Sequence, residues 1–194
     1  MVRVKVSGVR SADEARRVDG LADYVAVYLG GPEGLNPSVA KEIAGTLSRS
    51  TPVAIVRGVP LPEAVRLAVD NGFRVLEYRH LMPSVSVATL AEIAERRGVR
   101  IAPLFPVSVE GAEPACSFYR SLTGLTGNIE YLVAYGSASS VPECASGSLV
   151  ATPLGEDACT LVGNGFGVID LDYRELGEDG VRLVIGALKR CGRG

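Results

Sequence analysis

The chain has 194 residues, of which 47% are hydrophobic, and a formal net charge of −2 at neutral pH. A charge this close to zero, with no basic block and no acidic tail, argues against a nucleic-acid partner. No run approaches the roughly 18 apolar residues of a membrane span. No charged segment followed by an apolar core opens the chain, so we expect a cytoplasmic protein without a membrane partner.

The first fifteen residues predict a strand, a turn and a helix in succession. Valines alternate with polar side chains from position 2 to position 7, which is the periodicity of a strand. Gly8 then permits a sharp change of direction. Ser11 is followed three residues later by Glu14, and this capping pattern predicts that a helix begins there. A strand that leads into a helix through a short turn is the building unit of α/β folds.

The same alternation continues along the chain. The expected strands occupy residues 2–7, 22–30, 52–58, 73–78, 99–105, 130–136, 148–152 and 166–171. The expected helices occupy residues 11–19, 36–48, 60–71, 84–97, 113–122 and 180–191. Residues 137–147 predict at best a short helix, and residues 156–162 predict one or two helical turns. The helices of the C-terminal part are therefore expected to be shortened.

Eight strands that alternate with helices predict a small (β/α)8 barrel, or TIM barrel. No composition shift or linker divides the chain, so we expect a single domain over residues 1–194. An open doubly wound sheet is the competing fold. It is disfavoured because no G-x-G-x-x-G motif follows the first strand, and because eight regular units exceed what most such sheets use.

The chain contains four cysteines, Cys116, Cys144, Cys159 and Cys191. None forms a C-x-x-C motif, and His80 is the sole histidine, so the sequence has no zinc-binding pattern. Unpaired cysteines are among the most buried residues of proteins. We therefore expect four reduced, mostly buried thiols, and we expect disulfides only if the chain comes from a hyperthermophile.

In a barrel the active site lies at the C-terminal ends of the strands. The polar or charged residues expected at these ends are Ser7, Tyr28, Arg57, Glu77, Arg79, Tyr135, Thr152, Asp170 and Asp172. Asp170 and Asp172 are two apart and share one face of a strand. They are an acid–base pair or, alternatively, rim carboxylates that cap the following turn. Glu77 and Arg79 alternatively pair with each other inside the barrel mouth.

The opening residues also carry a family resemblance. The run K-V-S-G-V-R at residues 5–10, followed by S-A-D-E-A, resembles the first strand and helix of phosphoribosylanthranilate isomerase, an enzyme of tryptophan biosynthesis. Residues 36–43 and 73–78 resemble its second helix and fourth strand. The resemblance implies a small barrel that converts a phosphorylated aminoaldose to an aminoketose, without a metal or an organic cofactor, with a homodimer as one possible assembly.

The functional positions of the family pattern differ in this chain. Ser7 stands where the family has its catalytic cysteine, and residues 132–135 lack the aspartate that serves as the family acid. A serine hydroxyl has too high a pKa to act as the base, whereas a thiolate is accessible. Pro153, which has no N–H, stands where the family has one of the glycines that bind phosphate.

Two hypotheses follow from these differences. The first is a diverged isomerase. Its catalytic residues would be Ser7, Asp170 and Asp172; its substrate-binding residues Arg57, Glu77, Arg79 and Tyr135; and its phosphate-binding residue Gly155. The second is a paralogue that has lost this chemistry and binds a small anionic ligand or serves a structural role. A cavity with a carboxylate pair and two free backbone amides at the seventh and eighth strands would favour the first. A barrel mouth filled by Tyr28, Tyr78 and Tyr135 would favour the second.

Overall fold

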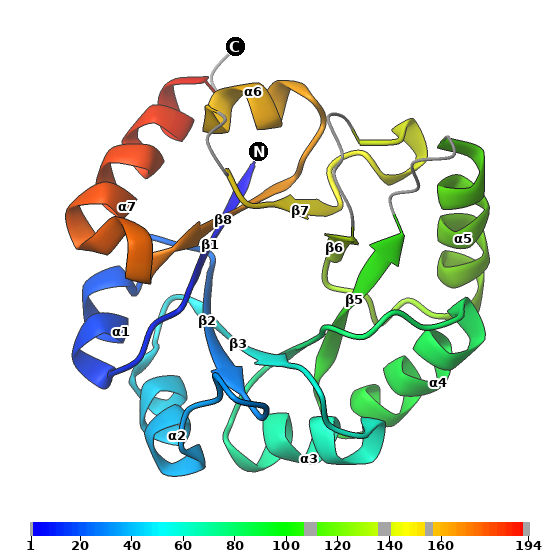
Figure 1. Cartoon of the computed structure of the whole chain (residues 1–194), viewed down its shortest axis with the longest axis horizontal. Coiled ribbons are helices and arrows are strands. Elements are labelled where there is room, and N and C mark those ends of the chain that lie inside the picture. Colours follow the sequence, from blue (N-terminus) through cyan, green and yellow to red (C-terminus); the bar gives the residue numbers. More distant parts are fainter. Residues whose placement is uncertain (1, 107–111, 136–140, 154–156, 192–194) are drawn as a thin grey trace.

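The structure is a computed structural model that describes residues 2–106, 112–135, 141–153 and 157–191. Eight parallel strands form a closed barrel in which each strand is hydrogen-bonded to the next and β8 pairs with β1 (Figure 1). The strands are β1 (Arg3–Ser7), β2 (Tyr24–Leu29), β3 (Thr51–Val56), β4 (Val75–Tyr78), β5 (Arg100–Pro106), β6 (Leu132–Tyr135), β7 (Leu149–Ala151) and β8 (Val168–Asp172). The predicted (β/α)8 barrel is confirmed.

The helices surround the barrel on its outside (Figure 1). They are α1 (Ala12–Val18), α2 (Pro37–Thr46), α3 (Leu61–Asp70), α4 (Ser84–Glu95), α5 (Ala112–Leu125), the single-turn helix η1 (Glu143–Ala145), α6 (Ala158–Gly163) and α7 (Tyr173–Cys191). The predicted shortening is confirmed for η1 and α6. The last helix begins at Tyr173 rather than at residue 180, because two helical segments meet at Gly177, which has a φ of 61°. None of the described helices is long and apolar enough to cross a membrane.

Local signals in the sequence position the first helix. The Ser11 hydroxyl accepts a hydrogen bond from the Glu14 N–H at 3.2 Å, and the Glu14 carboxylate accepts one from the Arg10 N–H at 2.7 Å. These bonds satisfy amide groups that the first helical turn leaves without a partner. The capping prediction for this helix is therefore confirmed.

Alternate residues of each strand form two separate apolar layers. One layer lies between the strands and the helices, and the other fills the barrel interior. The interior layer consists of Tyr24, Ala26, Val53, Ile55, Val75, Ala102, Leu104, Tyr131, Val133, Val150 and Val168. β1, β4 and β8 also carry one buried charged residue each, namely Lys5, Glu77 and Asp170. Strand alternation therefore brings polar chemistry into the centre of the barrel.

The four cysteines form two disulfides, so the expectation of reduced thiols is wrong. Cys116 of α5 is bonded to Cys144 of η1, and Cys159 of α6 is bonded to Cys191 at the end of α7. The partners are 28 and 32 residues apart, and the folded chain brings each pair of Cα atoms to 5.8 Å. Each bond ties one of the two shortest helices to a longer neighbouring helix.

Candidate active site

Three charged side chains meet in the barrel interior. The Lys5 ammonium lies 2.5 Å from Oε2 of Glu77 and 3.0 Å from Oδ2 of Asp170. The side chains of Lys5 and Glu77 are completely buried, and that of Asp170 is 3% exposed. Removing charges from water is costly, so such groups persist inside a protein only when they are paired. Lys5 thus forms ion pairs with two carboxylates, Glu77 and Asp170.

Glu77 receives more hydrogen bonds than its neighbour. Besides Lys5, the Arg79 Nε donates to Oε1 at 2.7 Å and the Tyr131 hydroxyl donates to Oε2 at 3.0 Å. Burial opposes ionisation of this carboxyl, but the charges of Lys5 and Arg79 outweigh it and lower the pKa of Glu77 to about 2. The predicted pairing of Glu77 with Arg79 inside the barrel mouth is confirmed.

Asp170 is held at one oxygen only. Its Oδ2 contacts Lys5, while its buried Oδ1 has no hydrogen-bond partner among the described residues. Burial raises the pKa of Asp170 above its usual value, although the neighbouring Lys5 lowers it. Asp170 lines a cavity of about 470 Å³ beside α6 and α7, whose other lining residues include Thr152, Asp172, Asp157 and Arg190. A buried carboxyl that lacks a partner at one oxygen and lines a cavity is a candidate functional group.

Asp172 is set in a different environment two residues further on. Its Oδ1 accepts hydrogen bonds from the Arg174 backbone N–H at 2.8 Å and from the Arg174 Nε at 3.1 Å. Its Oδ2 accepts one from the Arg174 guanidinium at 2.7 Å. The hydrogen bonds from Arg174 lower the pKa of Asp172 despite its partial burial. Asp172 therefore caps the turn after β8, as the alternative prediction has it, and stays ionised.

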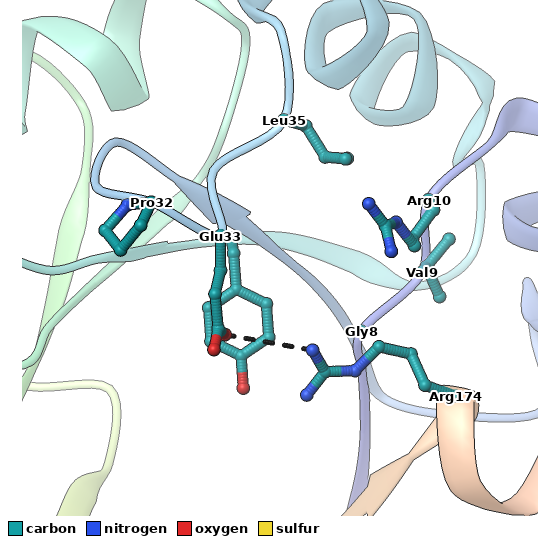
Figure 2. Close-up of a pocket in the computed structure, with 8 residues that line it drawn as sticks. Gly8, Val9, Arg10, Pro32, Glu33, Leu35 and Arg174 are labelled. Carbon is teal, nitrogen blue, oxygen red and sulfur yellow. Dashed lines mark ion pairs between the residues drawn. The ribbon is translucent and has the colours of Figure 1, made fainter.

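A second, smaller pocket opens at the barrel rim beside Asp172. It has a volume of about 240 Å³, and Figure 2 shows the side chains of Arg10 and Arg174 pointing into it. Its lining residues are Gly8, Val9, Arg10, Tyr28, Pro32, Glu33, Leu35 and Arg174. The Arg174 guanidinium lies 5.2 Å from the centre of the Tyr28 ring and 3.8 Å from the Glu33 carboxylate. The pocket thus combines cations with an aromatic and aliphatic surface.

The chain is 31% identical to N-(5'-phosphoribosyl)anthranilate isomerase from Aeropyrum pernix, in an alignment that covers 98% of this chain and 99% of that relative. The chain belongs to the phosphoribosylanthranilate isomerase family. The resemblance of the first fifteen residues is thereby confirmed. No protein-family model matches the sequence.

Solved structures of phosphoribosylanthranilate isomerases share the fold. The enzyme from Pyrococcus furiosus superposes with a TM-score of 0.74 at 14% identity, over 98% of this chain and 100% of that one. A second, in complex with reduced 1-(o-carboxyphenylamino)-1-deoxyribulose 5-phosphate, superposes with a TM-score of 0.64 at 15% identity and the same coverage. At these identities the superpositions establish the barrel fold alone.

Ser7, which aligns with the catalytic cysteine in the sequence resemblance, lies beside Asp172 in the sheet. Ser7 is buried, at the C-terminal end of β1, and is in register with Asp172 on β8. Gly8, the next residue, has a φ of 80°, and a Cβ atom there would lie 2.7 Å from Oδ1 of Asp172. This phosphoribosylanthranilate isomerase homologue therefore needs glycine at position 8 to fit the Asp172–Arg174 pair.

The remaining predicted residues have no contact with Asp170 or Asp172 that is described in the structure. Arg57 is exposed just beyond the end of β3, and Tyr135 ends β6 in register with Pro106. Gly155 lies outside the described residues. Tyr78 does not fill the mouth, because its side chain belongs to the layer outside the barrel and its hydroxyl donates to the Val59 carbonyl. Asp170 and Asp172 line one cavity, so the carboxylate pair of the first hypothesis is present. The chain after β7, where the backbone amides of that hypothesis are expected, lies partly outside the described residues.

Sequence reasoning missed two residues of the rim pocket, Arg10 and Arg174. Each follows the end of a strand by two or three residues. The loops after the strands form the catalytic face of a barrel, so this position could have marked both arginines as candidates. Both resemble ordinary solvated arginines in sequence, and only the closure of β1 against β8 brings them together. Among the described residues, no group of three or more His, Cys, Asp and Glu side chains is arranged to hold a metal ion.

Proposed function

We propose that this family member catalyses the isomerisation of N-(5'-phosphoribosyl)anthranilate, the Amadori rearrangement of tryptophan biosynthesis. The observation that carries the proposal is the unpartnered Oδ1 of Asp170 beside the cavity at the end of β8. A buried carboxyl oxygen without a partner costs stability, so a barrel that had lost its chemistry would gain nothing by keeping one. The family membership also favours the isomerase over the alternative of a re-purposed paralogue.

Asp170 is the proposed general acid. Because its pKa is raised, Asp170 keeps its proton up to a higher pH than an exposed aspartate does. It donates this proton to the ring oxygen of the aminosugar as the bond between that oxygen and C1 breaks. The nitrogen lone pair forms the C1–N double bond, which leaves an open-chain iminium ion. Asp170 is then ionised and is stabilised by Lys5.

Asp172 is the proposed general base. Its lowered pKa keeps it ionised, so it can accept the C2 proton, and the electron pair of that bond neutralises the iminium to an enolamine. The enolamine then releases its hydroxyl proton to Asp170 and accepts a proton at C1 from Asp172. Both carboxyls regain their starting states, and no electrons enter or leave the substrate. Ser7, beside Asp172 in the strand register, can hydrogen-bond the substrate oxygen at C2.

The rim pocket is the proposed place for the aromatic carboxylate of the substrate. Arg10 supplies a fork-shaped donor group that matches a carboxylate, and Arg174 adds positive charge while it holds Asp172. Tyr28 and Leu35 supply an apolar surface for the ring. The bound analogue in the family structure described above has an aromatic carboxylate and a phosphate. We further propose that Arg57 and Arg79 bind anionic groups of the substrate.

The remaining proposed contacts complete the substrate site. Tyr135 at the end of β6 contacts the substrate, and Glu77 contributes by fixing Arg79. Gly155, which follows β7 at the catalytic end of the barrel, binds the phosphate through its backbone amide. We also propose that the protein acts in the cytoplasm, where amino-acid biosynthesis takes place, and that it assembles as a homodimer. Light scattering of the purified protein tests the homodimer.

Turnover of phosphoribosylanthranilate, followed by the loss of its fluorescence, tests the proposed function. We expect activity in the wild-type protein and a fall of about 10²–10⁴-fold in Asp170→Asn and in Asp172→Asn, the usual contribution of a general acid or base. A Ser7→Cys variant, assayed beside them, shows whether a thiolate adds to the activity. Absence of wild-type turnover, or full activity in both asparagine variants, would overturn the proposal.

A further inference from the structure

Lys5 is shared unequally between its two carboxylate partners. Its ammonium lies 2.5 Å from Glu77 but 3.0 Å from Asp170. Glu77 also accepts hydrogen bonds from Arg79 and Tyr131, so both of its oxygens are occupied. Asp170 has Lys5 at one oxygen and no hydrogen-bond partner at the other among the described residues. The network thus satisfies one carboxylate and leaves the other incomplete.

We propose that Glu77 is a positioning residue for the reaction: by competing for the Lys5 ammonium, it keeps Lys5 from pairing with Asp170 alone and so leaves Asp170 able to act as the acid. The inference rests on the proposed function for its catalytic consequence. Its structural basis, the competition of two carboxylates for one buried ammonium, stands on the geometry alone. Glu77 itself is fully buried and touches no substrate, so it acts only through its neighbours.

All the charged and titratable groups around Asp170 are consistent with this role. Lys5 from β1 contacts it at 3.0 Å, and the Arg79 guanidinium from β4 lies 4.0 Å away. Glu77 on β4 repels its negative charge, and Tyr131, just before β6, interacts with it electrostatically as a neutral phenol. Asp172 follows on the same strand, and its negative charge is paired with Arg174.

Glu77 is the group in this set whose removal would strengthen the ion pair between Lys5 and Asp170. A neutral glutamine at position 77 would take away a repelling charge and would leave Lys5 with Asp170 as its sole carboxylate partner. Both changes favour the ionised form of Asp170 and therefore lower its pKa. A general acid must be protonated, so activity would then fall at a lower pH than in the wild type.

The experiment compares Glu77→Gln with the wild-type protein and with Glu130→Gln as a matched control. Glu130 is a largely buried carboxylate that is bonded to Tyr24 at 2.5 Å and to Arg100 at 2.6 Å, but it lies at the opposite, N-terminal end of the strands. The pKa of Asp170 is measured directly by NMR of isotope-labelled carboxyl carbons. The pH profile of kcat/KM is measured in parallel.

In Glu77→Gln we expect the Asp170 pKa to fall, and the alkaline limb of the profile to move to lower pH with it. Above that limb, activity relative to the wild type falls about tenfold per unit of pKa shift, so the loss is larger at high pH than at low pH. Glu130→Gln should leave both the pKa and the limb in place. A loss of activity that is equal at every pH would indicate a merely structural role and would overturn the inference.

Two further outcomes keep the inference independent of turnover and of the variant's folding. If the wild-type protein is inactive, the proposed function fails, yet the NMR titration still shows whether Glu77 controls Asp170. If Glu77→Gln does not fold, Glu77→Asp replaces it, because the shorter side chain withdraws the carboxylate from Lys5. An unchanged Asp170 pKa in the variant that folds would refute the role of Glu77.

Discussion

Lys5 on β1 reaches across the barrel interior to Glu77 on β4, 72 residues later, and its Nζ lies 2.5 Å from the carboxylate. Because Asp170 shares the same ammonium, Lys5 is the cation that keeps two buried carboxylates in the folded protein. The barrel therefore depends on one charged residue at a position where most barrels place apolar side chains.

Replacing Lys5 by methionine should destabilise the protein by about 3–5 kcal/mol at neutral pH, because it leaves the buried Asp170 without its close cation, while Glu77 keeps Arg79. Without the ammonium, the pKa of Asp170 in the folded state rises further above its unfolded value. Such a group contributes stability at low pH that is lost as the pH rises. Urea unfolding at about pH 4.5 and about pH 8 should therefore show the larger deficit at the higher pH. An equal deficit at both would contradict this account.

Arg10→Met should raise KM by about ten- to a hundredfold with a smaller change in kcat, since the loss of a charged hydrogen bond is worth about 1.5–3 kcal/mol. Arg10 is preferable to Arg174 for this test, because Arg174 also holds Asp172. Arg16→Met serves as the control, since Arg16 is an exposed arginine of α1 that pairs with Asp13. Steady-state kinetics distinguish the two variants, and an unchanged KM in Arg10→Met would remove Arg10 from the substrate site.

Loss of either disulfide should lower the free energy of unfolding by about 3–4 kcal/mol, the loop-closure value for bridges that span 28 and 32 residues. Cys116→Ser/Cys144→Ser and Cys159→Ser/Cys191→Ser test the bridges one at a time in denaturant unfolding. A reducing agent should lower the wild-type stability by a comparable amount for each bridge that it opens. It should have no effect on a variant that lacks all four cysteines.

Asp19→Asn should destabilise the protein at neutral pH by about 1.5–3 kcal/mol, since the carboxylate accepts hydrogen bonds from the backbone amides of Ser48, Arg49 and Ser50. Although partial burial opposes ionisation, these bonds lower the pKa of Asp19 to about 2. A lowered pKa gives stability that is present above the unfolded value and is lost as the pH falls through the folded one. The difference between wild type and variant should thus shrink between about pH 4 and about pH 2.

The control for this prediction is Asp13→Asn, which removes an exposed ion pair with Arg16 on α1. Exposed pairs contribute about 0–1 kcal/mol, so Asp13→Asn should stay close to the wild type in the same unfolding measurement. A loss in Asp13→Asn as large as that in Asp19→Asn would show that surface charge, and not the hydrogen-bonded loop, controls acid stability.

The sequence by itself determined the alternation of strands and helices and the family. These features depend on neighbours within a few residues, such as the valine alternation before Ser7 and the Ser11 cap, which Glu14 completes in the structure. The spacing of two residues along one strand also shows which of them share a face, although it does not show which face points inward. Asp170 and Asp172 could therefore be placed on one face of β8 from their spacing alone.

Only the tertiary structure decided which of these residues meet. The Lys5–Glu77–Asp170 network and the two disulfides join residues that are far apart in the chain, and no local pattern encodes such contacts. The different environments of Asp170 and Asp172 likewise arise from closure of the barrel, which buries the first against Lys5 and sets the second on Arg174. Burial and charge pairing are properties of the closed barrel, and they determine which carboxyl keeps its proton.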